Sequence, residues 1–303
     1  MDIKTQFAGD EQFTRLCRGD DEVDLIGLLL ELAADAQPEL NQQAERMAIY
    51  ELSLEFRELL RPIIERLYAH RPALCAAFDS HQPCEIPLAD DDEARPLLAA
   101  ASAVFRHELG FVGDDEDYYQ PANSYLPQVL KRRKGIPITL SLLFRELAAR
   151  SGLPMYGVCT PGHFVLGYPT EEPLYVDAYS GGVLSQPKMR SKIEQVTGEP
   201  FWSDDVFLPA PHVAIAARVL RNLKGAYARA EDWRQALVVQ RRLAALLPEL
   251  AEEQRDLGLL LVREGHAWPA LEILEPYVQQ RPEEAQALEP FVRAARRMSV
   301  QWN

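Results

Sequence analysis

The C-terminal third of the chain repeats itself about every 34 residues, and this period restricts the folds that it can adopt. Residues one period apart match: Leu223 with Leu257, Tyr227 with Leu261, Ala236-Leu237 with Ala270-Leu271, and Pro248 with Pro282. Such a period is typical of tetratricopeptide repeats, in which each helix pair buries its face against the next pair. We therefore expect residues 206–303 to form an all-α domain of two repeats and a capping helix over 283–301.

The preceding segment, 101–205, changes from a helical to a strand-like pattern. An apolar helix is predicted over 139–150, and Gly152 suits the left-handed residue that ends such a helix. Short β-prone stretches then alternate with proline and glycine, which predicts one small antiparallel sheet from the strands Met155–Val158, Phe164–Tyr168 and Leu174–Val176. Helices followed by strands indicate an α+β core.

Residues 1–100 carry helical periodicity, and we expect them to pack on this core. A first helix is predicted to be capped by Asp20 or Asp21, because a carboxylate accepts the unpaired N–H groups of a first turn. Pro62 is expected to kink or divide a second helix. The stretch 80–96, which is acidic and contains three prolines, is predicted to form an exposed loop before a further helix.

Charge and cysteine usage limit the possible partners. The net charge of −14, from 32 basic and 46 acidic side chains, opposes binding to nucleic acid or anionic lipid. No apolar run reaches the roughly 18 residues of a membrane helix, and no signal-peptide pattern opens the chain. The six histidines lack ligand spacing, so we expect no metal and no cofactor. Scattered cysteines without a paired motif indicate reduced thiols in a cytoplasmic protein: Cys17, Cys75, Cys84 and Cys159.

A histidine and an aspartate give the strongest local signal for chemistry. His163 starts one predicted strand and Asp177 ends the next, so an antiparallel hairpin brings the two side chains together. A carboxylate that accepts from one imidazole nitrogen leaves the other nitrogen as a base, which is two-thirds of a nucleophile–His–Asp system. The same pair is also common as a structural hydrogen bond, so it leaves the function open.

The central region resembles the bacterial family that joins a transglutaminase-like core to a tetratricopeptide tail, the SirB family of invasion-regulator-linked proteins. The resemblance covers nearly the whole chain. It rests on Gly110-Phe111, Gly113, Tyr118-Tyr119, Pro121, Asn123-Ser124-Tyr125-Leu126, Val129-Leu130, Arg133, Gly135-Ile136-Pro137-Ile138-Thr139-Leu140-Ser141, Gly152-Leu153, Gly157-Val158, Pro161-Gly162-His163-Phe164 and Asp177.

This resemblance implies a papain-like transglutaminase core. In that fold a cysteine at a helix N-terminus attacks an acyl donor, a histidine is the base and an aspartate orients the histidine. His163 and Asp177 match the last two positions, but the nucleophile position falls near Pro137 or Ile138, where no cysteine stands. The resemblance therefore favours a non-catalytic protein that acts in protein or peptide binding or in regulation.

A cysteine-type hydrolase or acyltransferase is the alternative. Cys159 precedes His163 by four residues, and a turn at Pro161-Gly162 can bring their side chains together. A free cysteine is more commonly a small buried residue without reactivity. The hydroxyls of Thr139 and Ser141 lie near the nucleophile position but lack the acidity of a thiol.

The remaining candidates are expected to form the wall of a pocket beside His163. Asparagine and serine side chains also anchor loops and cap helices, threonine caps helices, and tyrosines pack, so a structural role is open for each. The pocket candidates are Tyr118, Asn123, Ser124, Arg133, Thr139 and Gly162. The identity of the protein or peptide partner and the oligomeric state stay open.

Overall fold

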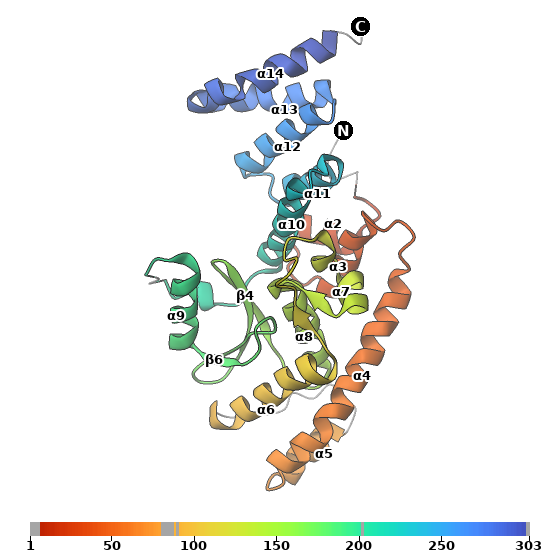
Figure 1. The fold of residues 1–303 in the computed structure, drawn as a ribbon, viewed down its shortest axis with the longest axis vertical. Coiled ribbons are helices and arrows are strands. Elements are labelled where there is room, and N and C mark those ends of the chain that lie inside the picture. Colours follow the sequence, from red (N-terminus) through yellow and green to blue (C-terminus); the bar gives the residue numbers. More distant parts are fainter. Residues whose placement is uncertain (1–6, 80–87, 89–90, 201–202, 301–303) are drawn as a thin grey trace. The chain divides into compact units, whose positions relative to one another are not determined.

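The computed structural model describes residues 7–79, 88, 91–200 and 203–300 (Figure 1). Its contacts divide the chain into two compact units. We call Asp24–Ile215 the core unit, and Met1–Val23 with Ala216–Asn303 the repeat unit. Residues 7–23 therefore group with the C-terminal repeats. The division at residues 100 and 205 that the sequence suggests stays a prediction.

The helices of the core unit follow one another in the predicted order, but some begin at other residues than predicted. They are α3 (Leu25–Ala34), α4 (Gln42–Leu67), α5 (Pro72–Asp79), α6 (Asp91–Ala103), α7 (Leu126–Arg132), α8 (Pro137–Arg150) and α9 (Gln186–Thr197), with short helical turns η1 (Val104–Glu108), η2 (Pro121–Asn123) and η3 (Asp205–Phe207). Helix α3 is capped by Asp24, whose carboxylate accepts from the Ile26 N–H at 3.0 Å, and not by Asp20 or Asp21. Pro62 lies inside α4 without dividing it.

Part of the predicted loop over 80–96 is helical. Residues 80–87 and 89–90 lie outside the described part, but α6 already begins at Asp91. Its first turn holds Asp91, Asp92 and Glu93, since carboxylates are favourable at the positive end of a helix. The acidic run therefore starts the helix.

The sheet is antiparallel and small, as predicted. Its strands are β3 (Tyr156–Thr160), β4 (His163–Tyr168), β5 (Leu174–Val176) and β6 (Val183–Ser185), paired in that order. Sequence reasoning missed β6. A separate parallel pair, β1 (Val112–Gly113) with β2 (Lys134–Gly135), precedes α8.

Helices cover both faces of the sheet in the core unit (Figure 1). On one face Val158, Val165 and Tyr175 form a buried cluster with Met189 and Ile193 of α9. Helix α8 contacts β4 and lies on the other side of the sheet in Figure 1. Successive residues of a strand point to opposite faces, so each strand residue can be assigned to one of these two layers.

Helix α10 (His212–Arg229) begins in the core unit and belongs to the repeat unit from Ala216 onward. The repeat unit also contains α2 (Glu11–Cys17), α11 (Trp233–Leu246), α12 (Ala251–Arg263), α13 (Ala267–Gln280) and α14 (Ala285–Val300), with the turn η4 (Pro282–Glu284). The apolar residues that recur with the 34-residue period inside the helices are buried, whereas Pro248 and Pro282, which follow the second helix of each pair, are exposed. Gly258 allows α12 to approach α13, because a Cβ there would lie 2.6 Å from the Leu274 side chain. Helix α14 follows the second pair as the predicted capping helix.

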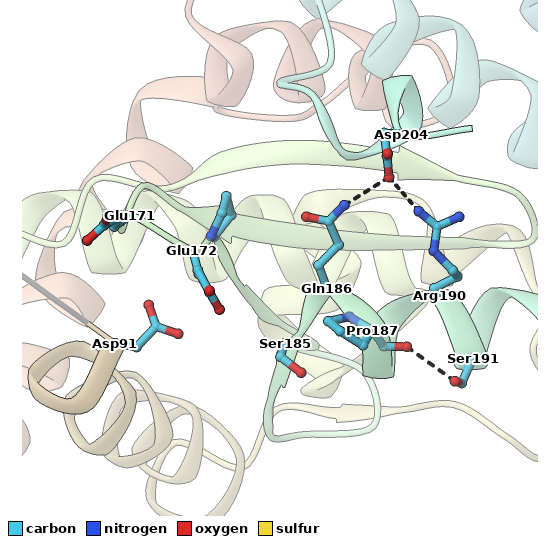
Figure 2. A pocket seen from close by; sticks show the side chains of 10 residues that line it. Asp91, Glu171, Glu172, Ser185, Gln186, Pro187, Arg190, Ser191 and Asp204 are labelled. Atoms are coloured by element: carbon cyan, nitrogen blue, oxygen red, sulfur yellow. Dashed lines mark hydrogen bonds and ion pairs between the residues drawn. The ribbon is translucent and has the colours of Figure 1, made fainter. Parts of the chain in front are cut away.

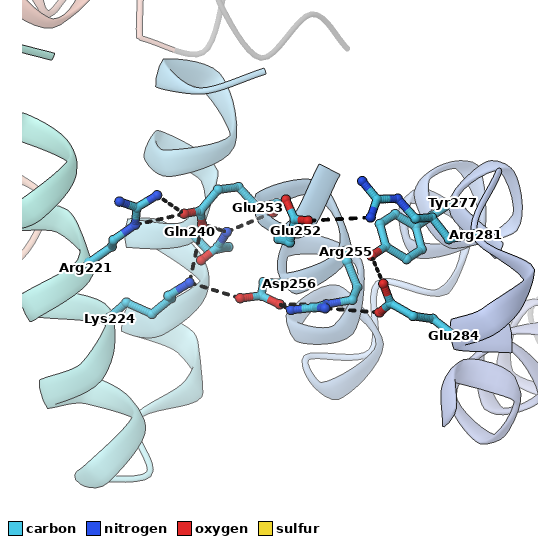
Figure 3. Close-up of polar contacts among 10 residues, drawn as sticks. All are labelled: Arg221, Lys224, Gln240, Glu252, Glu253, Arg255, Asp256, Tyr277, Arg281 and Glu284. Carbon is cyan, nitrogen blue, oxygen red and sulfur yellow. Dashed lines mark hydrogen bonds and ion pairs between the residues drawn. The ribbon is translucent and has the colours of Figure 1, made fainter. Parts of the chain in front are cut away.

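Polar contacts link neighbouring helices of the repeat unit (Figure 3). Buried Glu253 of α12 accepts from Arg221 of α10 at 2.8 Å and from Gln240 of α11 at 2.9 Å. Burial alone would raise the pKa of Glu253, but these hydrogen bonds and the charge of Lys224 hold it below its ordinary value. The carboxylate is therefore ionised at neutral pH, and it connects three successive helices.

Candidate functional site

His163 and Asp177 are hydrogen-bonded, as their spacing predicts. The distance from His163 Nε2 to Asp177 Oδ2 is 2.9 Å, and both side chains are buried. His163 begins β4 and Asp177 directly follows β5. Continuing the β4–β5 register places Asp177 opposite Val165, so His163 is its diagonal neighbour on the same face of the sheet.

Asp177 accepts hydrogen bonds from four groups. Its Oδ1 accepts the backbone N–H groups of Tyr179 and Ser180, each at 3.0 Å. Its Oδ2 accepts from His163 and also from the ammonium of Lys192 on α9. Burial opposes ionisation, but the hydrogen bond and charge of His163, together with Lys192, hold the pKa of Asp177 well below its ordinary range. Asp177 is therefore a carboxylate at neutral pH.

Sequence reasoning missed Lys192, although it contacts the same carboxylate oxygen as His163. Lys192 Nζ also lies 3.1 Å from Ser180 Oγ. The lysine stands on a helix that follows a further strand, so no local spacing relates it to Asp177. The predicted pair is thus a three-residue cluster that joins β4, the end of β5 and α9.

The start of α8, where the transglutaminase nucleophile is expected, is occupied by a helix-capping residue. Thr139 is fully buried, and its hydroxyl donates to the carbonyl of Asn123 at 2.7 Å. The same oxygen accepts from the Ile136 N–H at 3.2 Å, so the hydroxyl fixes the first turn of the helix. Ser141 is also fully buried, and its hydroxyl has no hydrogen-bond partner among the residues that the structure describes.

Cys159 points away from His163. In the β3–β4 register Thr160 pairs with His163 and Cys159 pairs with Phe164. Paired residues share a face and consecutive residues alternate, so Cys159 and His163 lie on opposite faces of the sheet. The turn at Pro161-Gly162 therefore does not bring the two side chains together. Cys84 lies outside the described residues.

Asn123 anchors the loop before α7. It is fully buried; its amide donates to the Asp117 carbonyl at 2.7 Å and its oxygen accepts from Arg132 at 2.8 Å. Arg132 also binds the buried carboxylate of Asp114 at 2.9 Å. Burial alone would raise the pKa of Asp114, but Asn123 and Arg132 contribute to holding it below its ordinary value. Ser124, the next residue, is buried at the end of η2.

Arg133 lines a different cavity from the expected one. It ends α7 with a φ of 58°, and its guanidinium stacks on the ring of Phe111 at 4.4 Å. The cavity has a volume of about 300 Å³ and lies between α4 and α7, with Ala48, Glu51, Leu52, Glu55 and Leu130 as its other lining residues. Neither His163 nor Asp177 lines it.

Gly162 occupies a position that requires glycine. It has a φ of 68° in the two-residue turn between β3 and β4, and a Cβ there would collide with the side chain of Val196 on α9. The turn therefore allows α9 to approach the sheet beside His163.

Tyr179 lies between His163 and the segment formed by β1 and the loop over 114–119. Its ring meets the imidazole edge to face at 6.4 Å, and a Cβ on Gly113 would lie 2.5 Å from the same ring. Its hydroxyl donates to Asp115 at 2.6 Å, and the ring of Tyr118 packs on it at 6.2 Å. Burial and the hydrogen bond to Asp115 raise the pKa of Tyr179 above its ordinary value. The loop over 114–119 thus covers His163 through Tyr179.

A second cavity, of about 700 Å³, opens at the start of α9 (Figure 2). Carboxylates predominate among its charged groups, and Arg190 is hydrogen-bonded to one of them, Asp204. His163 and Asp177 do not line this cavity either. Its lining consists of Asp91, Glu171, Glu172, Pro173, Ser185, Gln186, Pro187, Arg190, Ser191 and Asp204.

Within the described part of the chain, no group of three or more histidine, cysteine, aspartate or glutamate side chains is placed to hold a metal ion. Among the helices described, none combines the length and apolar character that crossing a membrane requires.

Comparison with known families agrees with this architecture. Residues 55–221, more than half of the chain, match the transglutaminase-like superfamily, and residues 223–295 match the tetratricopeptide repeat. The chain therefore belongs to the transglutaminase-like superfamily, with a tetratricopeptide region after the core. No solved structure gave a significant match.

Three individual proteins illustrate how similar this chain is to known sequences. The UPF0162 protein of Xylella fastidiosa strain Temecula1 is 37% identical over 191 residues, which cover 61% of this chain and 68% of the relative. The UPF0162 protein of Vibrio cholerae is 27% identical over 227 residues, covering 73% and 81%. F-box only protein 21 of Pongo abelii is 33% identical over 135 residues, covering 41% of this chain and 21% of that protein.

Proposed function

We propose that this protein is a non-catalytic, transglutaminase-like protein that binds a protein or peptide segment, in the manner of an adaptor or regulator. The observation that carries the proposal is at the start of α8. The residues there are Pro137, Ile138 and Thr139, and the one hydroxyl among them is buried and bonded to backbone. A His–Asp pair without an activated nucleophile cannot start acyl transfer.

The surroundings of the pair support the same proposal. Lys192 shares Oδ2 of Asp177 with His163, so the carboxylate is already compensated by a fixed cation. The ring of Tyr179 and the loop that holds it cover the imidazole. Both features stabilise a closed arrangement, whereas a catalytic base must reach its substrate.

The repeat unit supports a binding role. Tetratricopeptide repeats stack into curved surfaces on which peptides and protein segments bind. Two repeats with a capping helix give a short surface, so we propose that the core unit has a binding surface of its own. We also propose a place in the SirB group and a cytoplasmic location, where the cysteines stay reduced.

The alternative is an enzyme that uses Cys159 with His163 and Asp177. The strand register counts against it, because the thiol and the imidazole lie on opposite faces of the sheet. We therefore favour the binding role.

Two assays on the purified full chain test the proposal. The first measures ammonia release and amine incorporation with a glutamine dipeptide, and we expect no turnover by the wild-type protein or by His163→Ala. Turnover that is lost in His163→Ala and kept in His107→Ala would overturn the proposal. His107 is an exposed histidine on η1 and serves as the matched control.

The second assay is in-cell crosslinking followed by mass spectrometry. We expect specific partners whose yield changes in His163→Ala and stays unchanged in His107→Ala. The absence of any specific crosslinked partner would count against the binding role.

A further inference from the structure

Four aromatic rings form a row from the buried His163 to the surface of the core unit. His163 meets Tyr179 at 6.4 Å, Tyr179 meets Tyr118 at 6.2 Å, and Tyr118 meets Tyr119 at 5.1 Å. Each ring is tilted by 71° to 86° against the next. Tyr119, at the outer end, is 51% exposed. We call Tyr118, Tyr119 and Tyr179 the tyrosine row.

Carboxylates border the tyrosine row. Asp115, Glu116 and Asp117 come directly before Tyr118, and all three are exposed. Asp115 accepts the Tyr179 hydroxyl, which fixes one carboxylate beside the rings. Glu116 is 85% exposed, and its contact with Lys134 at 3.2 Å is a surface ion pair of small energy.

We propose that the tyrosine row and its carboxylates form a docking surface for lysine or arginine side chains of an extended, basic segment of a partner protein. The faces of tyrosine rings attract cations, and neighbouring carboxylates add to this attraction. This inference rests on the proposed binding function and names the chemistry of the partner. The partner contacts the loop over 114–119, which covers the His163 cluster through Tyr179.

Charge complementarity favours a basic segment as the ligand of this surface. The chain carries a net charge of −14, so a basic segment is attracted over distance as well as at the surface. A second copy of the same chain has the same net charge and is repelled. An acidic segment would be repelled by the three exposed carboxylates, and an apolar segment would cover them without adding a compensating charge, which costs desolvation energy.

The test uses the full chain and a fluorescein-labelled octapeptide of alternating lysine and glycine, with fluorescence anisotropy as the readout. Octapeptides in which glutamate or glutamine replaces lysine are the peptide controls. We expect binding of the lysine peptide alone, and we expect it to weaken steeply as salt is raised.

Two variants locate the surface. Tyr119→Ala removes an exposed ring and should weaken binding about fivefold, equivalent to about 1 kcal/mol, whereas Tyr119→Phe keeps the ring and the affinity. Glu116→Gln removes a border charge and should weaken binding about twofold to fivefold. Glu172→Gln removes the same charge at an exposed site on a different loop and is the matched control. Equal weakening by both glutamate variants would mean that net charge alone attracts the peptide, and it would overturn the proposed site.

The outcomes separate this inference from the function on which it rests. If the lysine peptide does not bind but crosslinked partners still depend on His163, the docking surface is wrong and the binding function stands. If His163-dependent turnover is found, the proposed function itself fails. Binding of the glutamate peptide with equal affinity would also refute the basic-partner inference.

Discussion

The cluster of His163, Asp177 and Lys192 can be tested by its effect on stability. Asp177→Asn keeps the shape of the side chain but removes the charge that Lys192 contacts. Breaking a buried ion pair from one side destabilises by about 3–5 kcal/mol. The lower end applies here, because the Lys192 side chain is 27% exposed and also contacts Ser180. We therefore expect Asp177→Asn to destabilise the fold by about 3 kcal/mol.

Substituting Lys192, alone and together with Asp177, gives the interaction energy between these two side chains. Lys192→Met leaves Asp177 with His163 and two backbone N–H groups, so it removes one charged hydrogen bond and should destabilise by about 2 kcal/mol. In the double variant the unpaired ammonium is absent, and we expect a total of about 3 kcal/mol, well below the sum of the single changes. Urea unfolding followed by circular dichroism measures all three values. Additivity within about 0.5 kcal/mol would refute the interaction.

The same cluster predicts a pH dependence with a defined sign. The folded pKa of Asp177 lies below its ordinary value of 3.8, so the ionised carboxylate stabilises the folded state above that pH. This contribution is lost as the pH falls through the folded pKa. Stability of the wild-type protein should therefore drop in acid more steeply than that of Asp177→Asn. Parallel profiles of the two proteins between pH 2 and pH 6 would contradict the assignment.

Three further predictions follow from local contacts. Thr139→Val removes a buried hydroxyl that bonds two backbone groups at the start of α8, and should lower the free energy of unfolding by about 2 kcal/mol in urea titrations. Gly258→Ala should destabilise by about 1 kcal/mol or more in thermal unfolding, because the clash with Leu274 outweighs the better helix propensity of alanine. Cys159 in the native protein should react with iodoacetamide at a rate that His163→Ala leaves unchanged, as read by mass spectrometry; a rate that depends on His163 would contradict the strand register.

Sequence reasoning succeeded where one local rule determines the position. The 34-residue period predicted the repeats, because each helix pair needs the same buried face. The hairpin predicted the contact between His163 and Asp177, because both residues stand at ends of adjacent antiparallel strands. Lys192 and Tyr179 were missed because their contacts depend on how α9 and the segment after β5 pack onto the sheet. Arg133 was predicted beside His163, but its guanidinium stacks on Phe111 instead. Its backbone is left-handed, and sequence spacing gives no sign of this.

The contact between Lys192 and Asp177 bears directly on whether His163 can act as a base. In a nucleophile–His–Asp system the carboxylate orients the imidazole and stabilises the positive charge that forms on it. Here the same oxygen already compensates a lysine cation from α9, so less of its negative charge is available to an imidazolium. An array of this kind holds β4, the end of β5 and α9 together. These contacts give His163 and Asp177 a structural role in the core unit, which agrees with the non-catalytic function that we propose.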